Sequence, residues 1–222
     1  MEYRVKIIDI NRVTHNVRSY KVEKPEGYSF IPGQATELSI DQPGWQNEKR
    51  PFTFTSLEQD PFLEFTIKSY RDHNGVTAKL EELKTGDHLL IGDVWGAIEY
   101  KGPGYFIAGG AGITPFIAIF RSLSQQNKMA GNRLFFANRR KDDIIYEEEL
   151  ARILGKENIV FILSDEKIPG YEDRMINADF LQQEVKDFHQ HFYICGPEPM
   201  TNAISNDLLS LGASPDAVVF EK

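Results

Sequence analysis

The sequence predicts two domains of different class, a small antiparallel β-barrel over residues 1–100 and an α/β domain with a parallel sheet over residues 101–222. Two observations carry this prediction. Up to about residue 100, short strand-like runs are separated by turns rich in Gly and Pro, which is typical of a small all-β domain. After the KGPG segment at 101–104, apolar runs alternate with amphipathic helical stretches, which is typical of a parallel sheet with crossover helices.

The first half contains six strand-like runs and one helical run. The strands are expected at 3–10, 17–23, 34–40, 51–56, 62–69 and 88–91, with turn signals such as PEG, QPG, DHNG and TGD between them. Apolar residues at helical spacing after Asn74-Gly75 predict a helix over 76–83. Six strands at this spacing favour a closed antiparallel barrel.

The second half reads as alternating strands and helices. Strands are expected at 105–109, 133–138, 158–163, 191–195 and 217–220, and helices at 114–126, 145–154, 177–187 and 197–211. Such an order requires right-handed crossovers and places the strands side by side in one parallel sheet.

Composition excludes several classes of partner and site. The net charge is −8, from 25 Lys+Arg against 33 Asp+Glu, so nucleic acid and anionic lipid are poor partners. The one cysteine, Cys195, cannot form an internal disulfide and is too few for a zinc or iron–sulfur site, so no metal is expected. No run approaches the roughly 20 apolar residues of a membrane span, and the charged N-terminus lacks a signal-peptide core. We expect a cytoplasmic protein; its oligomeric state stays open.

A glycine cluster at a strand-to-helix junction is the most informative local pattern. In YFIAGGAGITPF (105–116), a strand runs into Gly110 and Gly112, Thr114 is the expected N-cap, and Pro115 is the expected first helical residue. Glycines allow close backbone approach, and a helix N-terminus offers N–H groups to a phosphate. The pattern favours a dinucleotide site, and the alternative is a tight turn without a ligand.

Two segments of the first half repeat this phosphate-binding chemistry. In RPFTFTS (50–56), Arg50 could pair with a pyrophosphate, an aromatic ring could cover a planar ligand, and a hydroxyl could bond a ring nitrogen. The alternative is that Phe52 and Phe54 fill the barrel and Arg50 is a surface charge. Gly75 followed by Val76-Thr77 at a helix start is either a second phosphate contact or an ordinary helix start.

The order of the motifs decides between these alternatives. Seven segments resemble, in order and over nearly the whole chain, those of the ferredoxin-NADP reductase superfamily: FIPGQ (30–34), RPFTFTS (50–56), IKSY with GVT (67–77), TGDHLLIGDVWG (85–96), GGAGITPF (109–116), DDIIYEEEL (142–150) and YICGPEPM (193–200). The resemblance implies an antiparallel β-barrel flavin domain, followed by an α/β Rossmann-like parallel-sheet nucleotide domain. The implied cofactors are FAD and NAD(P)H.

By this resemblance, the flavin is bound by residues of the first domain. They are Arg50, Pro51, Phe52, Thr53, Ile67, Lys68, Gly75, Val76 and Thr77. Among them, Arg50 resembles the arginine that faces the flavin pyrophosphate, and Phe52 takes the place of a ring-stacking tyrosine without its hydroxyl. Thr53 resembles the hydroxyl residue near flavin N5 and is a candidate catalytic residue. Two phosphate features together favour FAD over FMN.

The resemblance assigns nicotinamide contacts to the second domain. They are Gly110, Gly112, Thr114, Pro115, Arg139, Ser164, Cys195, Gly196 and Pro197. Cys195 resembles the cysteine beside the nicotinamide, and we expect no thiolate nucleophile there. Phe220 resembles a terminal aromatic residue that covers the flavin, although it could instead continue an apolar strand into the core. Glu221 resembles a glutamate near the active site, so Cys195 and Glu221 join Thr53 as candidate catalytic residues.

The loop after 158–163 bears on the choice of nucleotide. It reads Ser164-Asp165-Glu166, and two carboxylates there would repel the extra phosphate of NADPH. Compensation could come from cationic side chains at Arg139, Arg140 and Arg174. The pattern leans slightly towards NADH.

The implied reaction is hydride transfer from NAD(P)H to FAD, followed by transfer of single electrons to a carrier such as flavodoxin or ferredoxin. Lys68 and Arg71 are candidates for a basic face that an acidic carrier could bind, or else a solvated strand end. A reductase component of an oxygenase and a free-flavin reductase are consistent with the same residues. A non-catalytic redox sensor or electron-transfer subunit is the alternative of a different class, and it would bind flavin without bleaching on addition of NADH or NADPH.

Overall fold

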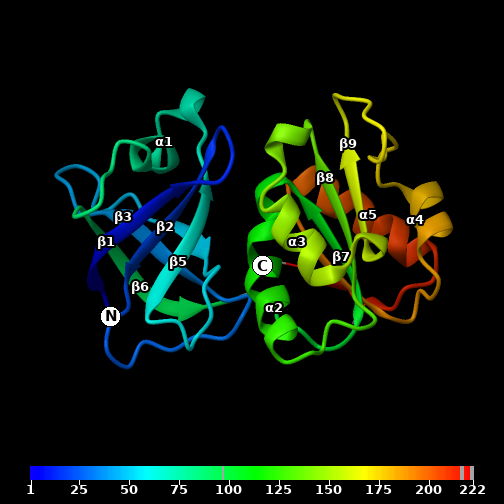
Figure 1. Ribbon diagram of the computed structural model, residues 1–222, viewed down its shortest axis with the longest axis horizontal. Helices are drawn as coiled ribbons and strands as arrows, with labels where there is room; N and C mark the ends of the chain where they lie inside the picture. Colours follow the sequence, from blue (N-terminus) through cyan, green and yellow to red (C-terminus); the bar gives the residue numbers. More distant parts are fainter. Residues whose placement is uncertain (97, 216–217, 221–222) are drawn as a thin grey trace. The chain divides into compact units, whose positions relative to one another are not determined.

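The computed structural model describes residues 1–96, 98–215 and 218–220. The chain divides into two compact units, Met1–Ala97 and Ile98–Lys222 (Figure 1). No helix in these three ranges is both long and apolar enough to cross a membrane, and no group of His, Cys, Asp and Glu in them has the arrangement of a metal site.

The first unit is built on a six-stranded antiparallel sheet. Its strands are β1 (Tyr3–Arg12), β2 (Val17–Glu23), β3 (Ala35–Ile40), β4 (Arg50–Thr53), β5 (Phe62–Lys68) and β6 (His88–Trp95). They pair in the order β4-β3-β6-β1-β2-β5. An antiparallel bridge between Phe54 and Phe65 then joins the chain after β4 to β5, so the two outer strands meet. The predicted antiparallel barrel is therefore confirmed.

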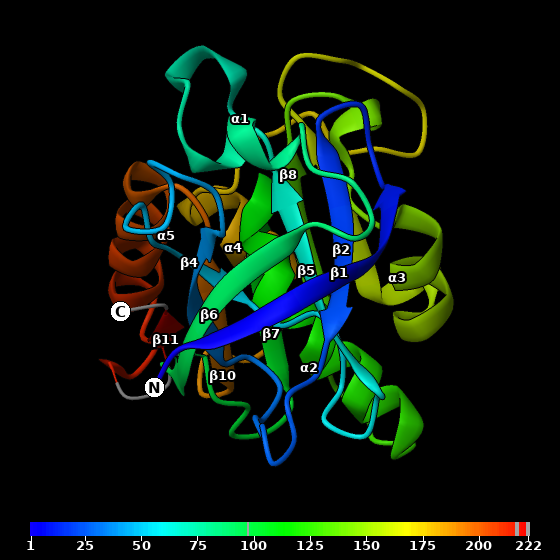
Figure 2. The same ribbon diagram turned by 90° about the vertical axis from the view of Figure 1, so that its left-hand side faces the viewer.

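Alternation of apolar and polar residues explains this sheet. In β1, Val5 and Ile7 are buried, whereas Arg4 before them and Lys6 between them are exposed. Figures 1 and 2 show that the short helix α1 (Val76–Leu80) lies at one end of the sheet. Its apolar residues join the barrel core, because Val76, Leu80 and Leu83 belong to the same buried cluster as Val5 and Ile7.

Two element boundaries differ from the expected ones. The helix ends at Leu80 rather than at residue 83, because side chains of β2 bind the carbonyl groups of Leu80 and Glu81. Strand β6 continues to Trp95 rather than ending at residue 91, because it pairs with β3 as far as Trp95 opposite Ala35. Gly92 and Asp93 interrupt the apolar pattern on which the shorter expectation rested.

The second unit is a five-stranded parallel sheet with helices on both faces. The strands β7 (Gly104–Gly109), β8 (Arg133–Asn138), β9 (Ile159–Leu163), β10 (His191–Cys195) and β11 (Val218–Phe220) lie in the order β11-β10-β7-β8-β9. The helices are α2 (Thr114–Gln125), α3 (Glu147–Leu154), α4 (Ala178–Glu184) and α5 (Glu198–Ser210). Figures 1 and 2 show α2 and α3 on one face of the sheet and α4 and α5 on the other. The predicted α/β parallel sheet is confirmed.

The strand order fixes where a ligand can bind in this unit. The chain adds strands outward from β7 in one direction as far as β9, and it then returns to the other side of β7 with β10. In open α/β sheets such a switch point leaves a crevice at the carboxyl ends of the strands. The loops after Gly109, Asn138, Leu163 and Cys195 all lie at that edge.

Candidate functional site

The first unit brings together the three segments expected to bind a flavin. The bridge between Phe54 and Phe65 places the chain after β4 beside β5, so residues 50–53 lie near the carboxyl end of β5. The third segment, Gly75–Thr77, follows β5 through one turn of 3-10 helix. It is tied back to that strand end, because the backbone N–H of Tyr70 donates to Thr77 Oγ1 at 3.3 Å.

Residues of β4 differ in what they can offer a ligand. Arg50 is exposed, and its guanidinium donates to the carbonyl of Lys49 at 2.7 Å and to Glu48 Oε2 at 3.4 Å. Five N–H donors in a planar fork leave it able to pair with a phosphate as well. Phe52 is half-buried against the barrel core and can therefore cover a planar ring with its open side. Thr53 is buried, with 7% of its surface exposed.

Phe54 does not share the role expected of Phe52. It is fully buried, and its ring stacks on Phe30 with centroids 4.3 Å apart and lies 5.2 Å from Phe65. The interpretation that an aromatic residue of this segment simply fills the barrel therefore holds for Phe54.

The segment Gly75–Thr77, which is expected to bind a flavin phosphate and is called the phosphate segment below, offers a ligand hydrogen-bond donors rather than a strong helix dipole. Helix α1 has five residues, too few for a large macrodipole, but the first N–H groups of any helix lack acceptors within it. The Thr77 hydroxyl accepts from Tyr70, which leaves its own hydrogen able to donate to a phosphate oxygen. The side chains of Val76 and Ile67 are buried in the core, so only their backbone groups could contact a cofactor.

In the second unit, two glycine turns pack directly against each other at the switch point. A Cβ on Gly112 would lie 2.2 Å from the carbonyl oxygen of Cys195, and one on Gly109 would lie 2.6 Å from Met200 Sδ. A Cβ on Gly196 would lie 3.1 Å from the backbone nitrogen of Gly109. These glycines are required first by the packing of the turn after β7 against the turn after β10. Gly110 has a φ of +53°, in the left-handed region that glycine adopts without strain.

One expectation at this junction is wrong. Thr114 is not the N-cap of α2 but its first residue; the N-cap is Ile113, and Pro115 is the second residue rather than the first. The 3-10 turn Gly110–Ile113 runs into the helix without an extended residue, so no side chain caps it. The Thr114 hydroxyl instead donates to the carbonyl of Ala111 at 3.0 Å.

The turn after β10 supplies the second wall of this half-site. Cys195 ends the strand with 5% of its surface exposed, which suits a contact through its backbone or sulfur edge rather than a reactive thiolate. Pro197 is the N-cap of α5. The backbone of Phe220, in β11, pairs with that of Ile194 in β10. The Phe220 side chain and all of Glu221 lie outside the described residues.

The loops after β8 and β9 run side by side. The backbone N–H of Ser164 donates to the carbonyl of Asn138 at 3.0 Å, and that of Asp165 donates to the carbonyl of Arg139 at 2.9 Å. The exposed Ser164 hydroxyl donates to Asp165 Oδ1 at 2.7 Å. The side chain of Arg139 is exposed at the same edge. The Arg139 guanidinium and the Asp165 carboxylate therefore both lie at this edge of the sheet, where the nucleotide is expected to bind.

Arg174 is already engaged with other residues. Its guanidinium donates to Glu172 Oε2 at 2.8 Å and to Gln183 Oε1 at 2.6 Å. Because Arg174 donates to it, the pKa of Glu172 is lowered to about 2. An arginine held in this way is poorly placed to compensate for Asp165 by binding a second phosphate.

Both half-sites fit the groups that they are expected to hold. The first unit offers a guanidinium at Arg50 and backbone N–H groups and a hydroxyl at Gly75–Thr77, and these are the kinds of donor that a diphosphate requires. In the second, Gly110 and Gly112 keep the chain close to the switch point, where a second diphosphate could approach backbone N–H groups.

Four residues of interest are not indicated by the sequence. Three of them make contacts next to the Gly75–Thr77 segment: Arg71 donates to the Glu81 carboxylate, Arg18 donates to the Glu81 carbonyl, and Tyr20 donates to the Leu80 carbonyl. No local pattern signals these contacts, because Arg18 and Tyr20 come from a distant strand. Asn138 is 7% exposed, and neither polar atom of its amide has a partner among the described residues; nothing local in the sequence signals this.

Comparison with known proteins assigns the two units. The Oxidoreductase FAD-binding domain family matches residues 4–100, and the Oxidoreductase NAD-binding domain family matches residues 106–206. NADH-cytochrome b5 reductase 1 of Coccidioides immitis is 30% identical over 90% of this chain and 71% of that protein. The reductase component of propane 2-monooxygenase from Rhodococcus jostii is 27% identical over the whole chain. The chain spans 63% of the length of that Rhodococcus relative.

A solved structure supports the same fold. The FAD/NAD-binding domain of nitric oxide dioxygenase from Vibrio cholerae superposes with a TM-score of 0.87, covering 98% of this chain and 97% of that one at 20% identity. The sheets, the two half-sites and the matched families agree: the chain belongs to the ferredoxin reductase superfamily and is an oxidoreductase with an FAD-binding and an NAD(P)-binding domain.

Proposed function

We propose that this NAD(P)H-to-FAD oxidoreductase prefers NADH and delivers its electrons singly to a separate protein carrier, of the ferredoxin or flavodoxin type, that serves an oxygenase. The observation that supports the cofactor sites is that each unit offers hydrogen-bond donors of the kind that a diphosphate requires, at Arg50 and Gly75–Thr77 in the first and at the Gly110–Pro115 turn in the second. A reductase component of propane 2-monooxygenase among the relatives supports the oxygenase setting. The proposed functional boundary lies between residues 100 and 101, just beyond the first compact unit.

Bound FAD supplies the conversion of a two-electron hydride into single electrons. The residues of the first unit hold and orient it. Arg50 and the Gly75–Thr77 segment bind its diphosphate, and Phe52 covers one face of its ring system. Pro51, Ile67 and Lys68 lie on the same strands, and Thr53 would offer a bound flavin a neutral hydroxyl group without adding charge to the site.

Residues of the second unit place the nicotinamide nucleotide. The turn Gly110–Pro115 binds its diphosphate through backbone N–H groups, and Cys195-Gly196-Pro197 borders the nicotinamide. Hydride transfer requires the reacting atoms to lie at about 3–3.5 Å, so positioning is the main contribution of these residues. Glu221 is proposed as a proton-path residue and Phe220 as a ring cover.

The preference for NADH rests on the loop after β9. Asp165 is exposed next to Ser164, and Glu166 Oε2 accepts from the backbone N–H of Lys141 at 2.9 Å. Both carboxylates lie at the edge where the 2′-phosphate of NADPH would add negative charge. Arg139 is the one cation of this edge for which we propose a contact to the nucleotide.

The acceptor must lie outside these residues. One cysteine cannot supply the four ligands of an iron–sulfur cluster, so a second one-electron centre would belong to another polypeptide or to a further domain. Lys68 and Arg71 are the basic residues for which we propose a contact with the acceptor, and Arg71 also pairs with Glu81.

Steady-state oxidation of NADH with matched concentrations of a [2Fe–2S] ferredoxin, a flavodoxin and free FMN tests the acceptor. We expect the protein carriers to be reduced with the higher kcat/KM. Faster reduction of free FMN than of any protein carrier would contradict the proposal and favour a free-flavin reductase. Flavin that stays oxidised with both nucleotides would favour a redox sensor.

A further inference from the structure

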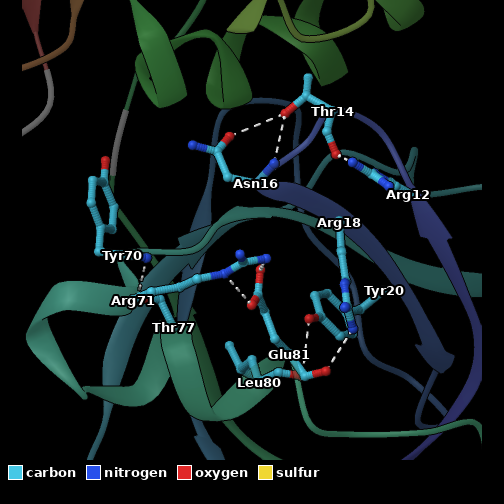
Figure 3. Close-up of polar contacts among 10 residues, drawn as sticks. All are labelled: Arg12, Thr14, Asn16, Arg18, Tyr20, Tyr70, Arg71, Thr77, Leu80 and Glu81. Carbon is cyan, nitrogen blue, oxygen red and sulfur yellow. Dashed lines mark hydrogen bonds and ion pairs between the residues drawn. The ribbon is translucent and has the colours of Figure 1, made fainter. Parts of the chain in front are cut away.

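An unusual carboxylate closes the loop that contains the phosphate segment. Glu81 is the C-cap of α1, beside the carbonyl groups that end the helix, which offer an acidic side chain no hydrogen-bond donor. Figure 3 shows its carboxylate facing the guanidinium of Arg71, which comes from the turn before the helix. The contact is bidentate, because Arg71 Nε donates to Oε2 at 2.8 Å and Nη2 donates to Oε1 at 3.2 Å.

The same residue is bound a second time through its backbone. Arg18 Nη1 of β2 donates to the Glu81 carbonyl at 2.6 Å, and the Tyr20 hydroxyl donates to the Leu80 carbonyl at 3.0 Å (Figure 3). Burial raises the pKa of Tyr20 to about 12, so its hydroxyl remains a donor near neutral pH. The end of α1 is therefore fixed to the barrel wall, and Arg71 is fixed to the end of α1.

The phosphate segment lies inside the loop that this ion pair closes. Gly75–Thr77 is flanked by Arg71 on one side and Glu81 on the other, and the Tyr70 N–H bond to Thr77 ties it again across the base of the loop. We propose that Arg71 and Glu81 are positioning residues that hold Gly75–Thr77 in the conformation that binds the FAD diphosphate. The inference rests on the proposed flavin role of that segment.

Geometry separates this pair from an ordinary surface ion pair. Exposed pairs usually add at most about 1 kcal/mol, because both side chains lose entropy and water screens their charges. Here the Arg71 side chain is 66% exposed, but the Glu81 carboxylate is 15% exposed, both of its oxygens are bound, and the backbone to which it belongs is held by Arg18. The neighbouring pair of Lys79 and Glu82 offers the contrast, with one contact at 2.5 Å and a carboxylate that is 64% exposed.

This contrast supplies a matched control for the experiment. Glu81→Gln removes the charge inside the closed loop, and Glu82→Gln removes the adjacent charge outside it. We expect Glu81→Gln to raise the FAD dissociation constant about fivefold or more, as measured by fluorescence titration of the apoprotein, and Glu82→Gln to leave it within about twofold. NAD⁺ affinity should be unchanged in both, because that site lies in the second unit.

A second pair of variants separates positioning from general loss of folding. Arg71→Lys keeps the charge but not the bidentate contact, so its FAD affinity should fall between those of wild type and Arg71→Met. Unfolding of the apo variants, followed by fluorescence of Trp45 and Trp95 in the same unit, should show that both variants remain almost fully folded under the conditions of the FAD titration. If Glu81→Gln is partly unfolded there, and its folded fraction accounts for the weaker FAD binding, the role is structural and the inference is overturned.

Two different results would contradict the flavin role of Gly75–Thr77 and the positioning role of Arg71 and Glu81. Wild-type protein that takes up no FAD contradicts the function proposed for the segment. Wild-type protein that binds FAD, together with Glu81→Gln that binds it as tightly as Glu82→Gln, contradicts only the positioning role of Arg71 and Glu81.

Discussion

Replacing Gly112 by alanine tests the packing of the two glycine turns. The added Cβ would lie 2.2 Å from the Cys195 carbonyl oxygen, 2.5 Å from the Cys195 carbonyl carbon and 2.7 Å from the Gly196 nitrogen. Ordinary contact begins at 3.4 Å, so the first of these distances is short by about 1.2 Å. All three atoms belong to the backbone, and no rotation of a side chain can relieve the overlap.

The expected cost follows from this overlap. Overpacking of a core usually costs about 1–3 kcal/mol, and a forced backbone shift belongs at the upper end of that range. A loss of about 3 kcal/mol corresponds to a fall in melting temperature of about 10 °C for a unit of this size. The displaced turn should also weaken NAD⁺ binding about tenfold or more, because it carries the proposed diphosphate contacts.

Far-UV circular dichroism and titration with NAD⁺ measure the two effects. Gly92→Ala is the matched control, since its Cβ would meet Thr36 Oγ1 at 3.7 Å, an ordinary contact, and its φ is not in the left-handed region. That variant should stay within about 1 kcal/mol of wild type. A Gly112→Ala protein as stable as Gly92→Ala, with unaltered NAD⁺ affinity, would show that the two glycine turns do not pack as closely as described and do not position the nucleotide.

Four other substitutions give distinct outcomes. Arg50→Ala should weaken FAD binding about tenfold or more, because a charge-assisted pair is lost, and full flavin occupancy after dialysis argues against that role. Asp165→Arg should raise the ratio of kcat/KM for NADPH over NADH about tenfold, and an unaltered ratio removes this loop from the specificity argument. Asn138→Leu should leave the free energy of unfolding in urea unchanged or higher by about 1 kcal/mol, since two amide atoms without partners among the described residues are replaced by methyl groups; a clear loss of stability contradicts this. The folded-state pKa of Glu172 lies below its usual 4.5, so the stability that this residue adds is present above pH 4.5 and is lost as the pH falls towards 2. Unfolding of Glu172→Gln should therefore approach that of wild type only at the acid end, and a constant difference down to pH 2 would be inconsistent with the ion pair.

Most of the fold was predictable because local patterns determine it. Val5 and Ile7 alternate with charged residues, and they lie in a strand that is buried on one face. The apolar run of β7 lies in a strand that is buried on both faces. Element ends were less predictable when a distant partner sets them. Strand β6 continues because β3 pairs with it, and α1 stops where Arg18 and Tyr20 take its carbonyls.

The site was predictable to the level of segments and not of contacts. The glycine cluster indicated Gly112, and the family resemblance indicated Phe52. A sequence cannot show that Gly112 is pressed against Cys195, or that Phe54 is in the core while Phe52 keeps an open side. The expectation that Thr114 caps α2 was wrong, because a 3-10 turn before it continues into the helix. The contact of Arg71 with Glu81 spans ten residues and depends on a turn that no local preference specifies.

Anaerobic titration of the purified protein with NADH follows the transfer of hydride to the bound flavin. We expect a yellow protein with one FAD per chain, whose flavin absorbance is bleached by about one equivalent of NADH and by NADPH less efficiently. A colourless protein that takes up no FAD, or a bound flavin that neither nucleotide bleaches, would contradict this expectation.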